Sequence, residues 1–236
     1  MSVIIPAFNE ENRLPDTLGQ IARYFGSSGI EGLEIIVVDD GSSDQTAGVV
    51  HARSQRDGRF RLLQNGGNRG KGFAVRHGML AACGEWRLMT DADLSTPVEE
   101  IVKLYESATR EDAPIAIGSR AVDRTLIKRH QPLLREMGGR FFNLVMRGVT
   151  GLPLWDTQCG FKLYRADAAE AVFSRQTLDG FSFDVEDMYI ARQLKLKVVE
   201  VPVVWSNAEG TKVGLQSTIR AFTDLIRIRL NHRASI

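Results

Sequence analysis

The chain has 236 residues, of which 43% are hydrophobic and 25% charged, a composition that suits one large α/β domain with its own core. Its formal net charge of +1 argues against a protein that wraps nucleic acid, because neutralising many phosphates needs a basic excess. Two cysteines, Cys83 and Cys159, are too few for a disulfide scaffold, so we expect a reducing, cytoplasmic setting. We find neither a signal-peptide pattern nor an apolar run of transmembrane length.

Strand and helix patterns alternate through the first half of the chain. Buried-strand patterns fall at 2–6, 33–39, 60–64 and 86–90, and helical patterns at 9–25, 43–55, 71–82 and 97–106. This alternation predicts a mostly parallel sheet covered by helices, with ligands bound beyond the carboxyl ends of the strands. Further along, the polar, basic segment 123–132 predicts a mobile loop, and the spacing at 133–149 and 215–230 predicts amphipathic helices.

The strongest chemical signal is the run Asp91-Ala92-Asp93 directly after the strand at 86–90. Two carboxylates at a strand end repel each other unless a cation lies beside them, and Mg²⁺ or Mn²⁺ takes oxygen ligands that it shares with substrate phosphates. The alternative is a solvated turn in which Asp93 or Ser95 caps the next helix.

Two further polar clusters follow strands. Asp39 and Asp40 end the strand at 33–39, where an acid suits a uracil N–H or a ribose hydroxyl. In Pro6-Ala7-Phe8-Asn9-Glu10 the glutamate leads the first helix, where it either faces the crevice or only complements the helix dipole.

In this order, the segments VIIPAFNEEN, IIVVDDGSSDQT, NGGNRGKGFAVRHGM and LMTDADLSTP resemble the nucleotide-binding half of the family 2 glycosyltransferases. The resemblance implies the GT-A fold, an α/β, Rossmann-like, mostly parallel sheet flanked by helices, with amphipathic C-terminal helices. It implies that Asp91 and Asp93 hold the metal, Mg²⁺ or Mn²⁺. The nucleotide-sugar contacts are expected at Pro6, Ala7, Phe8, Glu10, Asp39, Asp40, Lys71, Asp91, Ala92 and Lys212.

The second half carries GSR at 118–120, WDTQCGFKLY at 155–164, FSFDVEDMYIAR at 181–192 and EVPVVWSNAEGTKV at 200–213. These segments are similar to the dolichyl-phosphate β-glucosyltransferases and, more broadly, to the polyisoprenyl-phosphate hexose synthases. The resemblance implies inverting transfer of a hexose, with glucose from UDP-glucose favoured, to polyprenyl or dolichyl phosphate, giving a β-linked lipid-phosphate sugar. Asp187 departs from the pattern, since an apolar residue is expected after the glutamate. This leaves open that Glu186 and Asp187 form the family's usual acidic pair, in which one of them is the base for a saccharide hydroxyl.

We therefore expect one domain over 1–236, in which 1–118 forms the nucleotide-binding half, 119–212 the acceptor-binding half and 213–236 a C-terminal amphipathic helix. The predicted catalytic residues are Asp91, Asp93, Asp184 and Glu186. With a lipid phosphate acceptor, Asp184 and Glu186 would grip donor-sugar hydroxyls, whereas with a sugar hydroxyl acceptor one of them would act as base. Otherwise they are first-turn acids of a helix.

Basic residues gather between 120 and 147. Arg120, Arg124 and Arg135 are predicted to meet the acceptor phosphate and anionic headgroups. Apolar residues interleave with them over 133–146, which fits either a helix lying in a membrane interface or a core helix with arginines at its rim. We expect a peripheral protein on the cytoplasmic face of a membrane.

Three alternatives stay open. One is a family 2 transferase acting on a saccharide hydroxyl, and another is a GDP-mannose-dependent polyprenyl-phosphate mannose synthase. A third, from a different class, is a non-catalytic nucleotide-sugar-binding module. The expected partners are the nucleotide-sugar, the lipid phosphate and the membrane surface, without nucleic acid.

Overall fold

A computed structural model describes residues 1–27, 32–208 and 215–232. Seven strands form one sheet in the order β3-β2-β1-β4-β7-β5-β8. They are β1 (Ser2–Ala7), β2 (Glu34–Asp39), β3 (Phe60–Gln64), β4 (Trp86–Thr90), β5 (Ile115–Ser119), β7 (Phe161–Arg165) and β8 (Val198–Pro202). β7 runs antiparallel to both of its neighbours, β4 and β5, and all other pairs in the sheet are parallel.

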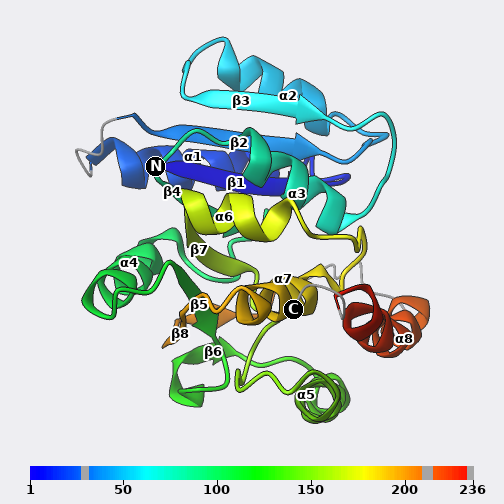
Figure 1. Ribbon diagram of the computed structural model, residues 1–236. Helices are drawn as coiled ribbons and strands as arrows, with labels where there is room; N and C mark the ends of the chain where they lie inside the picture. The colour runs from blue at the N-terminus through cyan, green and yellow to red at the C-terminus, as the bar shows by residue number, and fades with distance from the viewer. Residues whose placement is uncertain (28–31, 209–214, 233–236) are drawn as a thin grey trace.

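The helices cover both faces of the sheet (Figure 1). One hydrophobic cluster joins the sheet to α3, α5, α6, α7 and α8, and the other joins it to α1, α2 and α4. Their bounds are α1 (Leu14–Ser27), α2 (Thr46–Ser54), α3 (Lys71–Ala81), α4 (Ile101–Arg110), α5 (Leu133–Thr150), α6 (Ala166–Phe173), α7 (Phe183–Gln193) and α8 (Leu215–Asn231), with 3-10 turns η1 (Val98–Glu100) and η2 (Arg124–Leu126). The predicted fold class, a mostly parallel α/β sheet flanked by helices, is confirmed.

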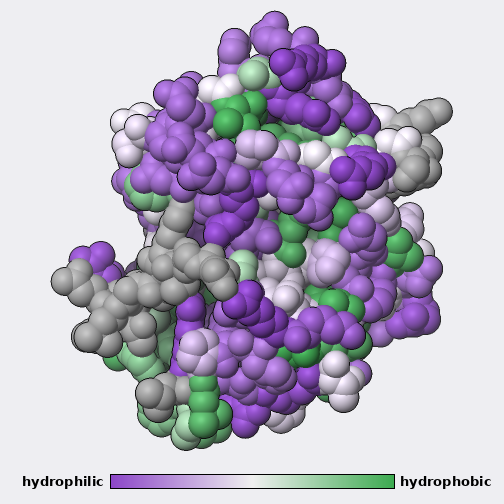
Figure 2. Space-filling view, turned by 180° about the vertical axis from the view of Figure 1, so that it is seen from behind, coloured by the Kyte–Doolittle hydropathy of each residue, from purple (hydrophilic) through white to green (hydrophobic). Residues whose placement is uncertain are grey.

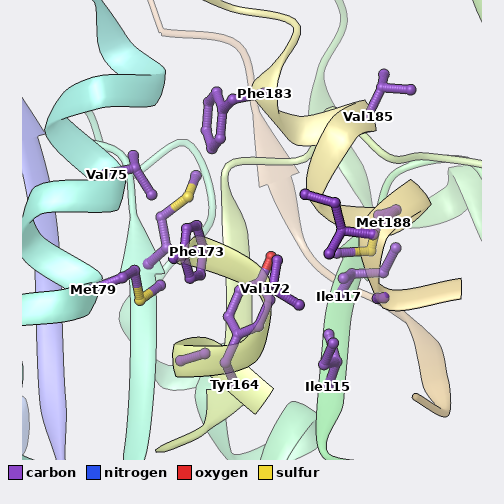
Figure 3. Close-up of a cluster of buried hydrophobic side chains, with 14 of the residues drawn as sticks. Val75, Met79, Ile115, Ile117, Tyr164, Val172, Phe173, Phe183, Val185 and Met188 are labelled. Carbon is purple, nitrogen blue, oxygen red and sulfur yellow. The ribbon is translucent and has the colours of Figure 1, made fainter. Parts of the chain in front are cut away.

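The first core cluster lies between the sheet and α7 (Figure 3). Phe183, Val185 and Met188 of α7 lie above Ile115 and Ile117 of β5, and Tyr164 rises from β7 into the same layer. β7 is buried at four of its five positions, as expected for an interior strand packed on both faces. This layer matters for function because α7 brings Asp184 to the upper edge of the sheet.

Two local predictions differ from the structure. The first helix begins at Leu14 instead of residue 9. Asn9 has a left-handed φ of 52°, outside the helical range, and the 42–46 loop holds the residues after it, since Glu10 N–H donates to Thr46 Oγ1 (2.8 Å) and Glu11 N–H to Asp44 Oδ2 (3.1 Å). The segment 123–132 is not simply a loop, since it contains η2 and the strand β6 (Ile127–Arg129), which pairs with β9 (Trp205–Ser206).

Candidate active site

The Asp91-Ala92-Asp93 turn follows the carboxyl end of β4 and is hydrogen-bonded to α1. Thr17 Oγ1 donates to the Ala92 carbonyl at 2.6 Å, and Leu94 has a left-handed φ of 44°. Asp93 Oδ1 accepts the Ser95 N–H at 2.9 Å, so the capping role foreseen for Asp93 is present.

Lys71, the first residue of α3, lies against Asp91, with 2.7 Å between Lys71 Nζ and Asp91 Oδ1. Both side chains are only partly exposed, at 22% and 32%. Burial by itself lowers the pKa of Lys71, but the carboxylates of Asp91, Asp184 and Asp93 outweigh it and the pKa is raised. The Lys71 ammonium is therefore stabilised by three nearby carboxylates.

Gly160 allows the Asp91 carboxylate to lie where it does. The antiparallel pairing of Thr90 with Phe161 brings the start of β7 beside the end of β4. A Cβ added at Gly160 would clash with the Asp91 carboxylate. Residue 160 must therefore lack a side chain for Asp91 to keep this position.

Asp39 and Asp40, at the end of β2, differ in how many hydrogen bonds they accept. Asp40 accepts three hydrogen bonds, from Asn65 Nδ2 (2.7 Å) and from the N–H groups of Arg69 (3.0 Å) and Gly70 (2.8 Å). It fixes the glycine-rich loop that leads to Lys71. Asp39 accepts the Ser42 N–H at 3.0 Å, while its second oxygen has only a 3.5 Å contact with Gln64. Asp39 thus retains more capacity for a ligand than Asp40.

The first strand and its loop supply the remaining predicted nucleotide contacts. Pro6 and Ala7 end β1 beside Val38 and Asp39 of β2. Phe8 is partly exposed, and Glu10 pairs with Arg13 at 3.0 Å. These residues share the sheet edge that carries Asp39 and Asp91.

Asp184 lies at the floor of the site in an ion pair with Lys162 of β7, and both side chains are buried. Burial raises the pKa of Asp184, and the ammonium groups of Lys162 and Lys71 partly oppose that rise. The Phe183 ring lies 5.9 Å from Lys71 Nζ and 5.7 Å from Lys162 Nζ. The Phe183 ring therefore lies near both ammonium groups, that of the Lys162–Asp184 pair and that of the Lys71–Asp91 pair.

Glu186 points elsewhere. Its fully buried carboxylate accepts from the Thr177 N–H (3.0 Å), the Thr177 hydroxyl (2.6 Å) and the Leu178 N–H (2.8 Å), and it pairs with His232 Nε2 (2.8 Å). Asp184 and Glu186 are two residues apart, about 200° around the helix, so they cannot face the same side. Glu186 ties the 177–178 turn to the end of α8.

Arg120 is the predicted acceptor residue nearest the site. Its Nε and Nη2 donate to Asp156 at 2.7 and 2.8 Å, and its pKa rises because the charges of Asp156 and Asp184 outweigh its burial. Arg124 instead pairs with Glu136 of α5, and Arg135 lies exposed in the first turn of α5. The structure therefore brings Arg120 to the acids and leaves Arg124 and Arg135 at the start of α5. Lys212 lies outside the described residues.

The acidic side chains suit a metal ion that also binds the substrate better than one held by protein ligands alone. Within residues 1–27, 32–208 and 215–232, no group of three or more His, Cys, Asp or Glu side chains is placed to hold a metal ion. Asp91 and Asp93 offer hard oxygen ligands beside a bound ammonium, and Mg²⁺ commonly completes its shell with water and substrate phosphates. These residues fit a divalent ion that arrives with a diphosphate.

Three contributors went unnoticed in the sequence: Lys162, Asp156 and Gly160. A lysine inside the apolar strand pattern FKLY was the available signal, because a fully buried lysine needs a nearby acid. Asp156 and Gly160 lie in the same WDTQCGFKLY segment, but their roles depend on contacts with Arg120 and Asp91.

The fold and the acids at its strand edge are those of an α/β glycosyltransferase. Residues 2–173 match the family described as Glycosyl transferase family 2, and the chain belongs to that family. The predicted family and the prediction of a glycosyltransferase enzyme are thereby confirmed.

Curated relatives carry a common name. A dolichyl-phosphate beta-glucosyltransferase of Trichomonas vaginalis is 37% identical over 100% of this chain and 75% of its own length. The dolichyl-phosphate beta-glucosyltransferase of Homo sapiens is 36% identical over 98% of this chain and 75% of its length.

Among solved structures, the chain is similar to glucosyl-3-phosphoglycerate synthase from Mycobacterium tuberculosis in complex with Mn²⁺, UDP-glucose and glycerol 3-phosphate. The TM-score is 0.68 at 18% identity, with 97% of this chain and 78% of that one covered. This likeness confirms the GT-A fold. Among the helices that the structure describes, none is both long and apolar enough to span a bilayer.

Proposed function

We propose that this chain transfers glucose from UDP-glucose to dolichyl or another polyprenyl phosphate, with inversion, at a membrane surface on its cytoplasmic side. The observation that carries the proposal is the convergence of Lys71, Asp91 and Asp184 at the carboxyl edge of the sheet. The relatives that span the whole chain act, by their names, on dolichyl phosphate. We assign 1–118 to the donor and 119–212 to the acceptor.

On the donor side, the diphosphate is the group that leaves with added negative charge. A Mg²⁺ or Mn²⁺ ion held by Asp91 and Asp93 would supply Lewis-acid stabilisation of that charge. Lys71 stands 2.7 Å from Asp91, where its ammonium adds a second positive charge. Asp39 and the loop at 6–10 would receive the nucleoside, and Asp184 would orient sugar hydroxyls.

On the acceptor side, the state of the acids favours a phosphate over a sugar hydroxyl. A hydroxyl acceptor requires a general base, whereas a phosphate is already ionised near neutral pH. Glu186 is fully engaged away from the site, and Asp184 is committed to Lys162. Arg120, fixed by Asp156, is the cation that would face the incoming phosphate.

The membrane contact is assigned to α5 and α8. Figure 2 shows hydrophobic side chains gathered at the lower left, where these helices lie. We call the exposed apolar residues there the docking face; their exposed fractions run from 57% to 73%, and they are Leu133, Met137, Phe141, Leu144, Ile226 and Leu230. Phe222 of α8 packs against Phe142 of α5, with ring centroids 5.3 Å apart. Arginines on the same helices carry the positive charge that attracts anionic lipid headgroups.

The test incubates the full chain with UDP-glucose, GDP-mannose or UDP-N-acetylglucosamine, each with polyprenyl phosphate in detergent and Mn²⁺ or Mg²⁺. We expect lipid-linked hexose from UDP-glucose alone, and its loss with a chelator. Transfer to a soluble saccharide with none to lipid phosphate would refute the acceptor assignment. UDP binding without turnover in any combination would indicate the non-catalytic module.

A further inference from the structure

Trp155 is a large apolar side chain that the fold leaves 56% exposed, directly before the buried Asp156 that clamps Arg120. Its main chain is fixed at both ends. The Trp155 N–H donates to Glu200 Oε2 at 2.9 Å, and its carbonyl accepts from Asn143 Nδ2 at 2.7 Å. The indole is therefore held at a defined place by its backbone, although burial contributes little to holding it.

Arg147 covers one face of this indole, with its guanidinium carbon 4.0 Å from the ring centroid. Arg147 and Asn143 are one turn apart on α5, so the Trp155 residue packs along that side of the helix. A ring stacked on one face and half exposed leaves its other face open to solvent. Such an amphipathic pair suits the boundary between an apolar chain and an anionic group.

The pair adjoins, along the chain, two features that the proposed function already uses. Leu144, 69% exposed on the docking face, is one turn before Arg147 on α5. On the other side, the next residue after Trp155 is Asp156, which accepts two bonds from the Arg120 side chain. Along the chain the pair is therefore next to both the docking face and the Arg120–Asp156 ion pair.

We propose that Trp155 and Arg147 bind the acceptor where its isoprenoid chain joins its phosphate. The open face of the indole packs on the isoprene units next to the phosphate, and the Arg147 guanidinium faces the anionic end, which then reaches Arg120. The inference rests on the proposed function, because it names the acceptor-binding residues of that same site. Trp155 acts here as a binding residue for the prenyl end of the acceptor.

The test compares Trp155→Ala and Trp155→Phe with the unaltered chain in detergent, using both a long polyprenyl phosphate and farnesyl phosphate. We expect Trp155→Ala to raise KM for both acceptors about tenfold, the effect of losing one well-packed aromatic contact, while Trp155→Phe recovers most of it. KM for UDP-glucose stays unchanged. Arg147→Met raises the acceptor KM as well, since the ring loses its stacked cation and the phosphate a partner.

Tyr105→Ala is the matched control, because Tyr105 is a 44% exposed aromatic of α4 with a ring partner in Trp86 at 5.6 Å. An acceptor KM that is the same in Trp155→Ala as in the unaltered chain overturns the inference. So does weaker binding to lipid vesicles with an unchanged KM for farnesyl phosphate, which would make Trp155 a membrane anchor only. If the unaltered chain glucosylates no lipid phosphate, the proposed function itself has failed.

Discussion

Lys71 Nζ lies 2.7 Å from Asp91 Oδ1, which joins the first residue of α3 to the first residue beyond β4. The glycine-rich loop before Lys71 is fixed by Asp40, and the turn at Asp91 is fixed by Thr17. Two rigid supports therefore set this contact before any substrate arrives. A preorganised charge of this kind stabilises a leaving group without a reorganisation cost.

Replacing Lys71 by methionine removes that charge. We expect kcat/KM for UDP-glucose to fall about 100-fold, the scale of losing one preorganised stabilising group, with Mn²⁺ binding unweakened because Asp91 and Asp93 remain. Steady-state transfer assays and Mn²⁺ titration measure the two effects. Lys103→Met is the control, since Lys103 also pairs with an acid, Glu100, at 2.6 Å, but on the surface of α4. Equal losses in both variants would contradict a role for Lys71 in the site.

The buried Lys162–Asp184 pair predicts a separation of stability from activity. Lys162→Met leaves Asp184 buried without its partner and is expected to lower the free energy of unfolding by about 3–5 kcal/mol. The double variant Lys162→Met, Asp184→Leu removes both charges and is expected to regain most of that stability. Transfer activity stays low in the double variant because Asp184 is absent from the site floor. Urea unfolding and transfer assays measure the two properties; an active double variant would rule out Asp184 as a substrate contact.

Asp187 predicts a pH dependence of stability. It is fully buried, and within the described part of the chain neither carboxylate oxygen has a hydrogen-bond partner. Burial raises the pKa of Asp187 well above the usual aspartate value, with Asp184 and Glu186 adding to the rise and Lys162 opposing it. The folded state therefore holds this proton more tightly than the unfolded state. Its stabilising effect is complete below the ordinary aspartate pKa and is lost as pH rises through the raised folded pKa.

Asp187→Asn cannot ionise, so its stability should lack this contribution to the pH dependence. We expect the Tm of the variant relative to the unaltered chain to increase from about pH 4 to about pH 8, by an amount equivalent to about 1–3 kcal/mol. Thermal unfolding followed by circular dichroism measures the difference. Asp16→Asn, at an exposed position of α1, serves as the comparison. Parallel Tm curves for all three proteins would show that Asp187 does not titrate between these pH values.

The docking face predicts that single charges weaken membrane binding without harming the fold. Phe141 and Leu144 are 61% and 69% exposed, so Phe141→Glu and Leu144→Glu disturb little packing. We expect each to reduce binding to anionic vesicles about tenfold, through lost apolar insertion and repulsion from the headgroups. Vesicle flotation at low and high salt measures this. Val102→Glu, on α4 at 46% exposure, should bind like the unaltered chain; an equal loss there would place the membrane contact elsewhere.

Much of the fold follows from local pattern. The strands predicted at 60–64 and 86–90 match β3 and β4, and the helix predicted at 133–149 matches α5 within one residue. In these elements hydrophobic residues recur at the spacing typical of a strand or a helix. That spacing can be read from neighbouring residues alone. The boundary at α1 could not be read in this way, because the left-handed Asn9 and the turn after it are held by contacts with the distant loop at 42–46.

The sequence by itself determined the order of elements, the family and the placing of Asp91 and Asp93 at a strand end, since each depends on neighbours along the chain. Only the tertiary structure decided that Lys71 meets Asp91, that Lys162 holds Asp184, and that Asp40 and Glu186 are committed to loops. The Lys162–Asp184 pair, for example, depends on β7 entering antiparallel between β4 and β5, which sets residues 160–162 beside residues far away in sequence. Pairing between distant strands leaves no local signature, so the partners of a charged side chain become known only when the chain is folded.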